Sequence, residues 1–93
     1  MTAPIPTLPE DDLLFRLLRQ LDLAPEASQR ATAGALGISL GRLNAVLKVV
    51  TGAGLVQITN RNSADKRQRY GYALTSRGAA EKARLTDRFL ARK

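Results

Sequence analysis

Gly37-Ile38-Ser39 separates two short segments of helical pattern in the middle of the chain, and this spacing limits the fold more than any other feature. Gly37 suits the left-handed conformation in which many helices end, because it has no side chain to clash there. Ser39 is a preferred residue at the start of a helix, since its hydroxyl can accept a hydrogen bond from the first turn. Ser28 can cap the segment before it in the same way. The sequence therefore predicts two helices joined by a tight turn.

Both segments carry apolar residues at helical spacing. Gly34 lies inside the first one, where glycine is less favourable than alanine by about 1 kcal/mol. It indicates either close packing between helices or a misplaced boundary. The second segment covers residues 39–52 and ends at Gly52-Ala53-Gly54. We expect the first to bury Ala31, Ala35 and Leu36, and the second to bury Leu43, Leu47 and Val50, with Leu40 and Val46 beside them.

Further elements are predicted on both sides of this pair. Leucines at positions 13, 14, 17, 18 and 21 form one helical stripe and predict a helix over residues 9–22, with capping-box spacing between Thr7 and Glu10. Two short alternating runs predict strands on either side of a loop at 60–69. Val56 and Ile58 alternate with polar residues in the first run, and Tyr70, Tyr72 and Leu74 alternate with small residues in the second. Thr75 can cap a last helix over residues 76–91, whose apolar side is Ala79, Ala80, Ala83, Thr86, Phe89 and Leu90.

The order of these elements predicts a mainly α fold with a small β-hairpin, the winged helix-turn-helix. We expect an extended N-terminal arm over residues 1–8 and a single domain over residues 9–93. Within that domain we expect a helix-turn-helix at 28–53, a hairpin or wing at 55–74 and a C-terminal helix at 75–92.

Charge and composition limit the function. The chain has 15 Lys and Arg against 8 Asp and Glu, a formal charge of +7. Seven of these cations and one acid lie in residues 28–74, which gives that segment a charge of +6 and favours a polyanionic partner. Cys and His are both absent. Their absence excludes disulfides and thiol or imidazole catalysis, so we expect no enzyme, no metal and no cofactor.

The same composition predicts where the chain acts. No apolar run approaches the ~20 residues that a membrane span needs. The first residues, Met1-Thr2-Ala3-Pro4-Ile5-Pro6, lack the basic and apolar regions of a secretory signal. We expect no membrane partner and a cytoplasmic, nucleoid-associated location.

The outer face of the helix at 39–52 predicts contacts with double-stranded DNA. A helix fits the major groove, where arginine can read guanine and asparagine can read adenine. Arginines and lysines also contact phosphates, as do the amides at helix N-termini. We predict base contacts by Arg42 and Asn44, close approach at Gly41 and Ala45, and backbone contacts by Lys48, Arg30 and Ser39, with Gln29 beside them.

The loop at 60–69 predicts a second contact. It is polar and basic, and arginine in a narrow minor groove senses the width of that groove. Its cations surround one acid, Asp65, and we predict that they contact the minor groove and the adjacent backbone: Arg61, Lys66, Arg67 and Arg69.

Several segments resemble the MarR family of bacterial transcription regulators: residues 37–44, Leu47-Lys48, Gly54-Leu55-Val56, Asp65-Lys66-Arg67 and Leu74-Thr75-Ser76-Arg77-Gly78. With Arg61-Asn62-Ser63, the tail over residues 81–93 is similar to the small MarR subgroup associated with exopolysaccharide genes. The resemblance implies that the protein binds double-stranded DNA as a homodimer and controls exopolysaccharide genes. It implies that Asp65 orients the wing through an ion pair and that Arg67 enters the minor groove. It also implies dimerisation through terminal helices, for which the candidates are Leu14, Leu18, Phe89 and Leu90.

Two other functions remain open on the sequence. A winged helix can serve protein interaction or assembly without specific DNA binding, with its basic face on an acidic protein surface. RNA binding is the other, although aromatic residues make up only 4% of the chain and give few rings for stacking on single strands. No small-molecule effector can be named, and a chain of this length leaves little space for an effector pocket.

Overall fold

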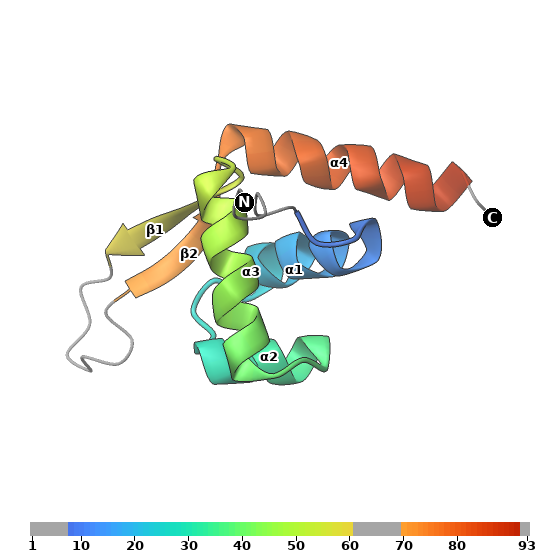
Figure 1. Cartoon of the computed structure of the whole chain (residues 1–93). Coiled ribbons are helices and arrows are strands. Elements are labelled where there is room, and N and C mark those ends of the chain that lie inside the picture. The colour runs from blue at the N-terminus through green and yellow to red at the C-terminus, as the bar shows by residue number, and fades with distance from the viewer. Residues whose placement is uncertain (1–7, 61–69, 92–93) are drawn as a thin grey trace, which may run out of the picture.

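The computed structural model describes residues 8–60 and 70–91, which form four helices and one antiparallel hairpin (Figure 1). This confirms the predicted mainly α fold with a small hairpin. In chain order the elements are α1 (Asp11–Leu23), α2 (Gln29–Leu36), α3 (Leu40–Gly52), β1 (Val56–Asn60), β2 (Tyr70–Leu74) and α4 (Ser76–Ala91).

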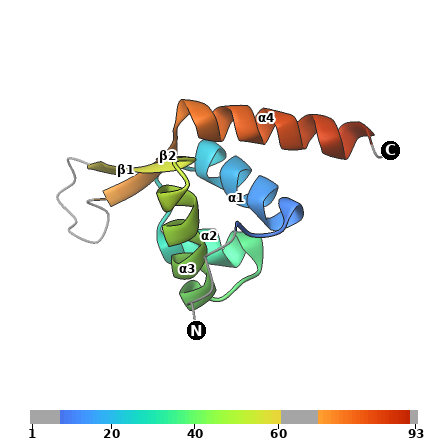
Figure 2. The same ribbon diagram turned by 45° about the horizontal axis from the view of Figure 1, so that its top comes forward.

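Helix α1 lies at the centre of the fold, between the α2–α3 pair and α4 (Figure 2). Its leucine stripe is buried as predicted, and Leu17 and Leu18 have no exposed surface. The other helices and the base of the hairpin each contribute apolar side chains to the same core: Ala33, Leu36, Leu43, Leu47, Val50, Leu55, Val56 and Leu85. Within the described ranges no single helix has the length and hydropathy of a membrane span.

The turn between α2 and α3 follows the sequence prediction. Gly37 adopts the left-handed conformation, with φ at 69°. The hydroxyls of Ser28 and Ser39 accept hydrogen bonds from the backbone N–H groups of Ala31 and Arg42, both at 3.1 Å. The two helix axes are bent by 99° across the turn, an angle typical of a helix-turn-helix.

Helix α4 docks on the connection between α3 and β1 through Thr75. The Thr75 hydroxyl donates to the carbonyl oxygen of Gly54 at 2.6 Å and accepts from the Gly78 N–H at 3.1 Å. The Thr75 N–H donates to the Leu55 carbonyl at 3.1 Å. One side chain therefore caps α4 and ties its start to the base of the hairpin.

In the N-terminal half, the predicted start of α1 and the predicted buried face of α2 are wrong. Helix α1 begins at Asp11 with Glu10 as its N-cap, and the Glu10 side chain makes no capping hydrogen bond. Thr7 lies outside the described residues. In α2 the buried residues are Thr32, Ala33 and Leu36, whereas Ala31 and Ala35 are exposed. Leu36 is the largest apolar residue of α2, so the buried stripe contains its neighbours three and four positions earlier.

Two further predictions of burial are wrong. Leu40 opens α3 and is 39% exposed. In α4 the buried residues are Gly78 and Leu85, and the predicted alanines are exposed: Ala79, Ala80 and Ala83. Burial of a leucine side chain removes more apolar surface from water than burial of one alanine methyl group, and Leu85 lies on the face that is turned to the core.

Candidate nucleic-acid interface

The outer face of α3 is free of contacts with the core. Leu43, Leu47 and Val50 are at most 3% exposed, which confirms the predicted inward stripe. Helical geometry then turns the other side of α3 to solvent. The five residues predicted to contact DNA from this helix are all exposed: Gly41, Arg42, Asn44, Ala45 and Lys48.

The cations of the helix-turn-helix make no ion pair with an acid that the structure describes. The acids of α1 pair with cations of α4: Asp11 with Arg88 at 2.7 Å and Asp22 with Lys82 at 2.9 Å. Within α4, Glu81 pairs with Arg84. By contrast, three cations of the helix-turn-helix have no acidic partner among the described residues: Arg30, Arg42 and Lys48. These side chains remain available to phosphates.

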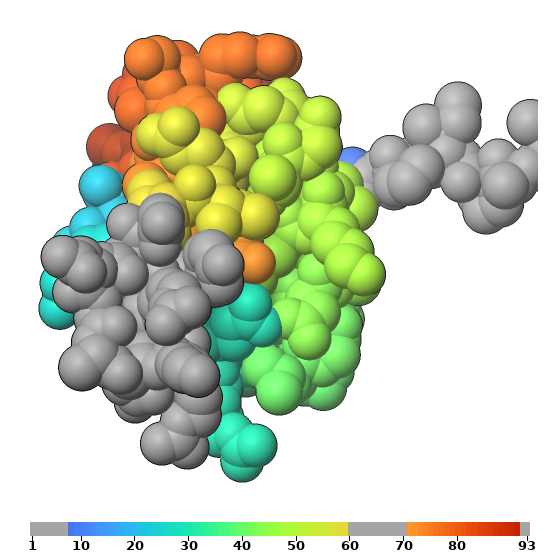
Figure 3. All heavy atoms as spheres, turned by 90° about the vertical axis from the view of Figure 1, so that its left-hand side faces the viewer, coloured from blue at the N-terminus to red at the C-terminus, as the bar shows by residue number. Residues whose placement is uncertain are grey.

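Helix α3 and the hairpin border one surface. In the view that looks onto the hairpin, β1 lies directly beside α3 (Figure 3). A shallow pocket of about 340 Å³ lies between them. We call it the α3–hairpin notch; it is lined by Asn44, Leu47, Lys48 and Thr51 of α3 and by Ile58 and Tyr72 of the hairpin. The outer face of α3 and the hairpin therefore lie next to each other on the protein surface.

Comparison with known families agrees with this geometry. The family described as winged helix-turn-helix DNA-binding matches residues 10–57, which is 48 of the 93 residues. The chain belongs to this winged helix-turn-helix family. The match runs from the start of α1 to the first residues of β1, so it contains the whole helix-turn-helix. No curated protein matches the sequence.

The winged helix is also similar to solved structures of transcription regulators. The PcaV transcriptional regulator from Streptomyces coelicolor has a TM-score of 0.72 and 23% identity, over 85% of this chain and 57% of PcaV. The transcriptional repressor CouR, bound to a 23-mer DNA duplex, has a TM-score of 0.66 and 33% identity, over 78% of this chain and 50% of CouR. The MarR family protein Rv2887 from Mycobacterium tuberculosis, in complex with p-aminosalicylic acid, has a TM-score of 0.62 and 27% identity, over 87% of this chain and 65% of Rv2887.

This winged helix thus matches regulators of the MarR family in fold, but it covers only part of each. The chain spans about half of the length of PcaV and CouR. The exopolysaccharide subgroup does not appear among these matches.

The sequence did not identify Tyr72 and Ile58 as part of this surface. The Gln29 side-chain amide, at the first residue of α2, donates a hydrogen bond to the hydroxyl of Tyr72 in β2, at 3.3 Å. This contact joins the helix-turn-helix to the hairpin across 43 positions of sequence. Tyr72 and Ile58 were identified only as strand residues. Alternation showed which face of the strand they share, but no local pattern reveals that this face adjoins Lys48.

The contacts predicted for the loop fall on residues outside the described ranges. These are Arg61, Lys66, Arg67 and Arg69, with the orienting acid Asp65. Ser39 has a definite role as the cap of α3, and its hydroxyl is already engaged by the Arg42 N–H. Its backbone is exposed at the helix start, so the predicted phosphate contact stays a prediction.

The proposed dimer residues divide into two kinds. Leu14 and Leu18 are 2% and 0% exposed, so their side chains are part of the core and offer no surface to a second copy. Phe89 is half-buried against Phe15, with ring centroids 5.3 Å apart. Leu90 is 62% exposed. Of these four candidates, Leu90 on α4 is the one whose side chain is exposed.

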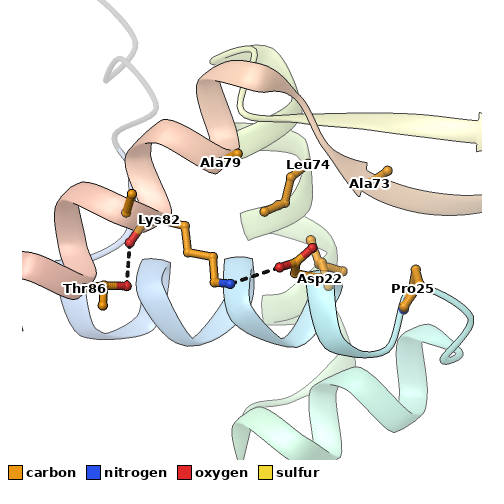
Figure 4. A pocket seen from close by; sticks show the side chains of 9 residues that line it. Asp22, Pro25, Ala73, Leu74, Ala79, Lys82 and Thr86 are labelled. Carbon is orange, nitrogen blue, oxygen red and sulfur yellow. Dashed lines mark hydrogen bonds and ion pairs between the residues drawn. The ribbon is translucent and has the colours of Figure 1, made fainter.

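A larger pocket lies between α1, the end of β2 and α4 (Figure 4). Its volume is about 500 Å³, within the usual range for small-molecule sites. The Lys82–Asp22 ion pair spans it, and apolar side chains such as Leu21 and Leu74 also line it. Whether this pocket takes an effector is not tested, so the expectation of little space for an effector pocket stays a prediction.

Proposed function

We propose that the chain is a sequence-specific DNA-binding transcription regulator. In this proposal α3, within the predicted recognition segment 39–52, enters the major groove, and the loop at 60–69 reaches the adjacent minor groove and backbone. The observation that carries it is the exposed face of α3, whose cations make no ion pair with a described acid, beside the hairpin. Membership of a DNA-binding family supports it.

Individual residues have distinct roles in this account. Arg42 and Asn44 read base edges, because both are exposed on α3 and carry the side chains that suit guanine and adenine. Gly41 and Ala45 let the helix approach closely. Arg30 and Lys48 bind phosphates, together with the N-terminal amides of α3 that follow Ser39. Arg67 enters the minor groove with Asp65 orienting the loop, supported by the neighbouring cations Arg61, Lys66 and Arg69.

We further propose that the regulator binds as a homodimer in the cytoplasm, on nucleoid DNA. Two recognition helices would then read half-sites about one helical turn, ~34 Å, apart. The exposed Leu90, with Phe89 beside it on α4, is the apolar surface that supports such contact. Control of exopolysaccharide genes rests only on the resemblance of residues 81–93, and no enzymatic activity is part of the proposal.

A titration on labelled duplex DNA tests this function. If about 5 phosphates are neutralised, the logarithm of the binding constant should fall with the logarithm of salt concentration with a slope of about −4.5. Arg42→Ala should weaken binding to a preferred sequence by about 1–3 kcal/mol. Arg84→Ala, on α4, is the matched control that removes one charge outside the proposed interface.

A protein-interaction module is the alternative that the same experiment separates. That reading requires the basic face to meet an acidic protein. Absence of duplex binding at low salt would contradict the DNA proposal and favour the alternative. A duplex RNA of the same sequence serves as competitor, and its preference over DNA would favour the RNA function instead.

A further inference from the structure

We propose that the α3–hairpin notch holds the DNA strand that runs between the two grooves. This inference rests on the proposed function and adds to it a site that the sequence did not predict. A helix in the major groove and a wing in the adjacent minor groove lie on opposite sides of one sugar-phosphate strand. That strand must therefore cross the surface between α3 and the hairpin, where the notch is located.

The chemistry of the notch matches a sugar-phosphate strand. Lys48, on its α3 side, is exposed and has no acidic partner among the described residues, so it can bind a phosphate. Ile58, on its hairpin side, is 56% exposed although it is a large apolar residue. Its side chain offers an apolar contact to a deoxyribose. The notch thus places a positive charge next to an apolar side chain, just as a DNA strand places a phosphate next to a deoxyribose.

Tyr72, which also lines the notch, carries a hydroxyl that can donate a hydrogen bond. Its ring packs against the core, and its hydroxyl oxygen accepts a hydrogen bond from the Gln29 side chain at 3.3 Å. Because the oxygen accepts from Gln29, the hydroxyl proton is turned away from it. In the part of the chain that the structure describes, this proton is donated to no other group. A phosphate oxygen in the notch can accept this proton.

Gln29 is therefore a positioning residue in this proposal. It is half-buried at the start of α2 and holds the hydroxyl of Tyr72 in one orientation. The same hydrogen bond fixes the hairpin relative to the helix-turn-helix. Binding of the strand in the notch would couple the major-groove contact of α3 to the minor-groove contact of the loop.

Three substitutions test the notch, with binding measured by fluorescence anisotropy on a labelled DNA duplex of about 25 base pairs over a range of salt concentrations. Tyr72→Phe keeps the ring and should lower affinity about 10-fold without changing the salt slope, because a neutral hydroxyl releases no counterion. Ile58→Ala should lower affinity about 3- to 5-fold at every salt concentration. Lys48→Ala should lower affinity and reduce the slope by about 1.

Matched variants separate the notch from general effects. Leu23→Ala removes an apolar side chain that is 67% exposed at the end of α1, outside the notch, and should bind as the unmodified chain does. Gln29→Ala should weaken binding, and adding it to Tyr72→Phe should cause little further loss, since both act through one hydroxyl. Thermal unfolding of each variant checks that the fold is retained, and Ile58 is exposed enough for its variant to remain folded.

The outcomes distinguish failure of the notch from failure of the proposed function. Loss of affinity in the notch variants with the predicted slopes supports the inference. If Tyr72→Phe and Ile58→Ala bind as tightly as the unmodified chain while Arg42→Ala does not, the notch proposal is overturned and the regulator proposal stands. If the unmodified chain binds no duplex at low salt, both are overturned.

Discussion

Gly78 and Leu55 approach so closely that a Cβ atom at Gly78 would lie 1.9 Å from the carbonyl oxygen of Leu55. That oxygen belongs to the backbone and also accepts the Thr75 N–H, so it cannot move without loss of the α4 docking contact. Close packing between α4 and the base of the hairpin therefore explains why position 78 is a glycine.

Gly78→Ala should lower the free energy of unfolding by about 2–3 kcal/mol, because the clash outweighs the helix propensity gained. Urea unfolding followed by circular dichroism measures this difference. A neutral or stabilising result would show that α4 does not sit on Leu55 as described.

Two exposed helical glycines should separate stability from DNA binding. A Cβ at Gly34 or at Gly41 would meet nothing within 4 Å. Each glycine-to-alanine substitution should therefore raise the free energy of unfolding by about 0.5–1 kcal/mol. Only Gly41→Ala should weaken duplex binding, because Gly41 lies on the DNA-contacting face of α3. Equal DNA affinity in both variants would argue against close approach at Gly41.

Thr75 should be essential for docking of α4. Thr75→Val keeps the shape but removes the hydroxyl that binds Gly54 and Gly78, and it should lower the free energy of unfolding by about 1–2 kcal/mol. Thr75→Ser retains both hydrogen bonds and is the matched control. Calorimetric unfolding compares them, and a valine variant as stable as the unmodified chain would show that the hydroxyl does not hold α4 in place.

Loss of the Thr51 hydroxyl should stabilise the fold, whereas loss of the Thr75 hydroxyl should destabilise it. Its side-chain oxygen is buried and has no hydrogen-bond partner among the described residues. Thr51→Val removes this hydroxyl with little change of shape and should raise the free energy of unfolding by about 1 kcal/mol. Thr51→Ser keeps the hydroxyl and should give no gain. A destabilised valine variant would mean that the hydroxyl is satisfied in solution.

The sequence predicted the elements whose signals are local. Ser28, Gly37 and Ser39 act through hydrogen bonds and backbone conformation within a few residues, and all three have the predicted roles. The inward stripe of α3 contains large aliphatic residues at clear helical spacing, so Leu43, Leu47 and Val50 were also predicted correctly.

Predictions failed where distant packing decides the result. Helix α4 contains many alanines, and only its contact with α1 and Leu55 determines that Leu85 and Gly78 face inward. Leu14 and Leu18 were dimer candidates by resemblance to the MarR family, but both belong to the leucine stripe that α1 buries in its own domain. Tyr72 was missed because its partner Gln29 lies in another element.

The central claim is that one surface, formed by α3 and the hairpin, binds duplex DNA. Amide chemical shifts of the isotope-labelled chain, recorded by NMR during a duplex titration at low salt, test it most directly. Signals of Arg42, Asn44, Lys48 and Tyr72 should shift together, while those of Ala83 and Arg84 on α4 should stay in place. Shifts concentrated on α4, with α3 and the hairpin unaffected, would contradict it.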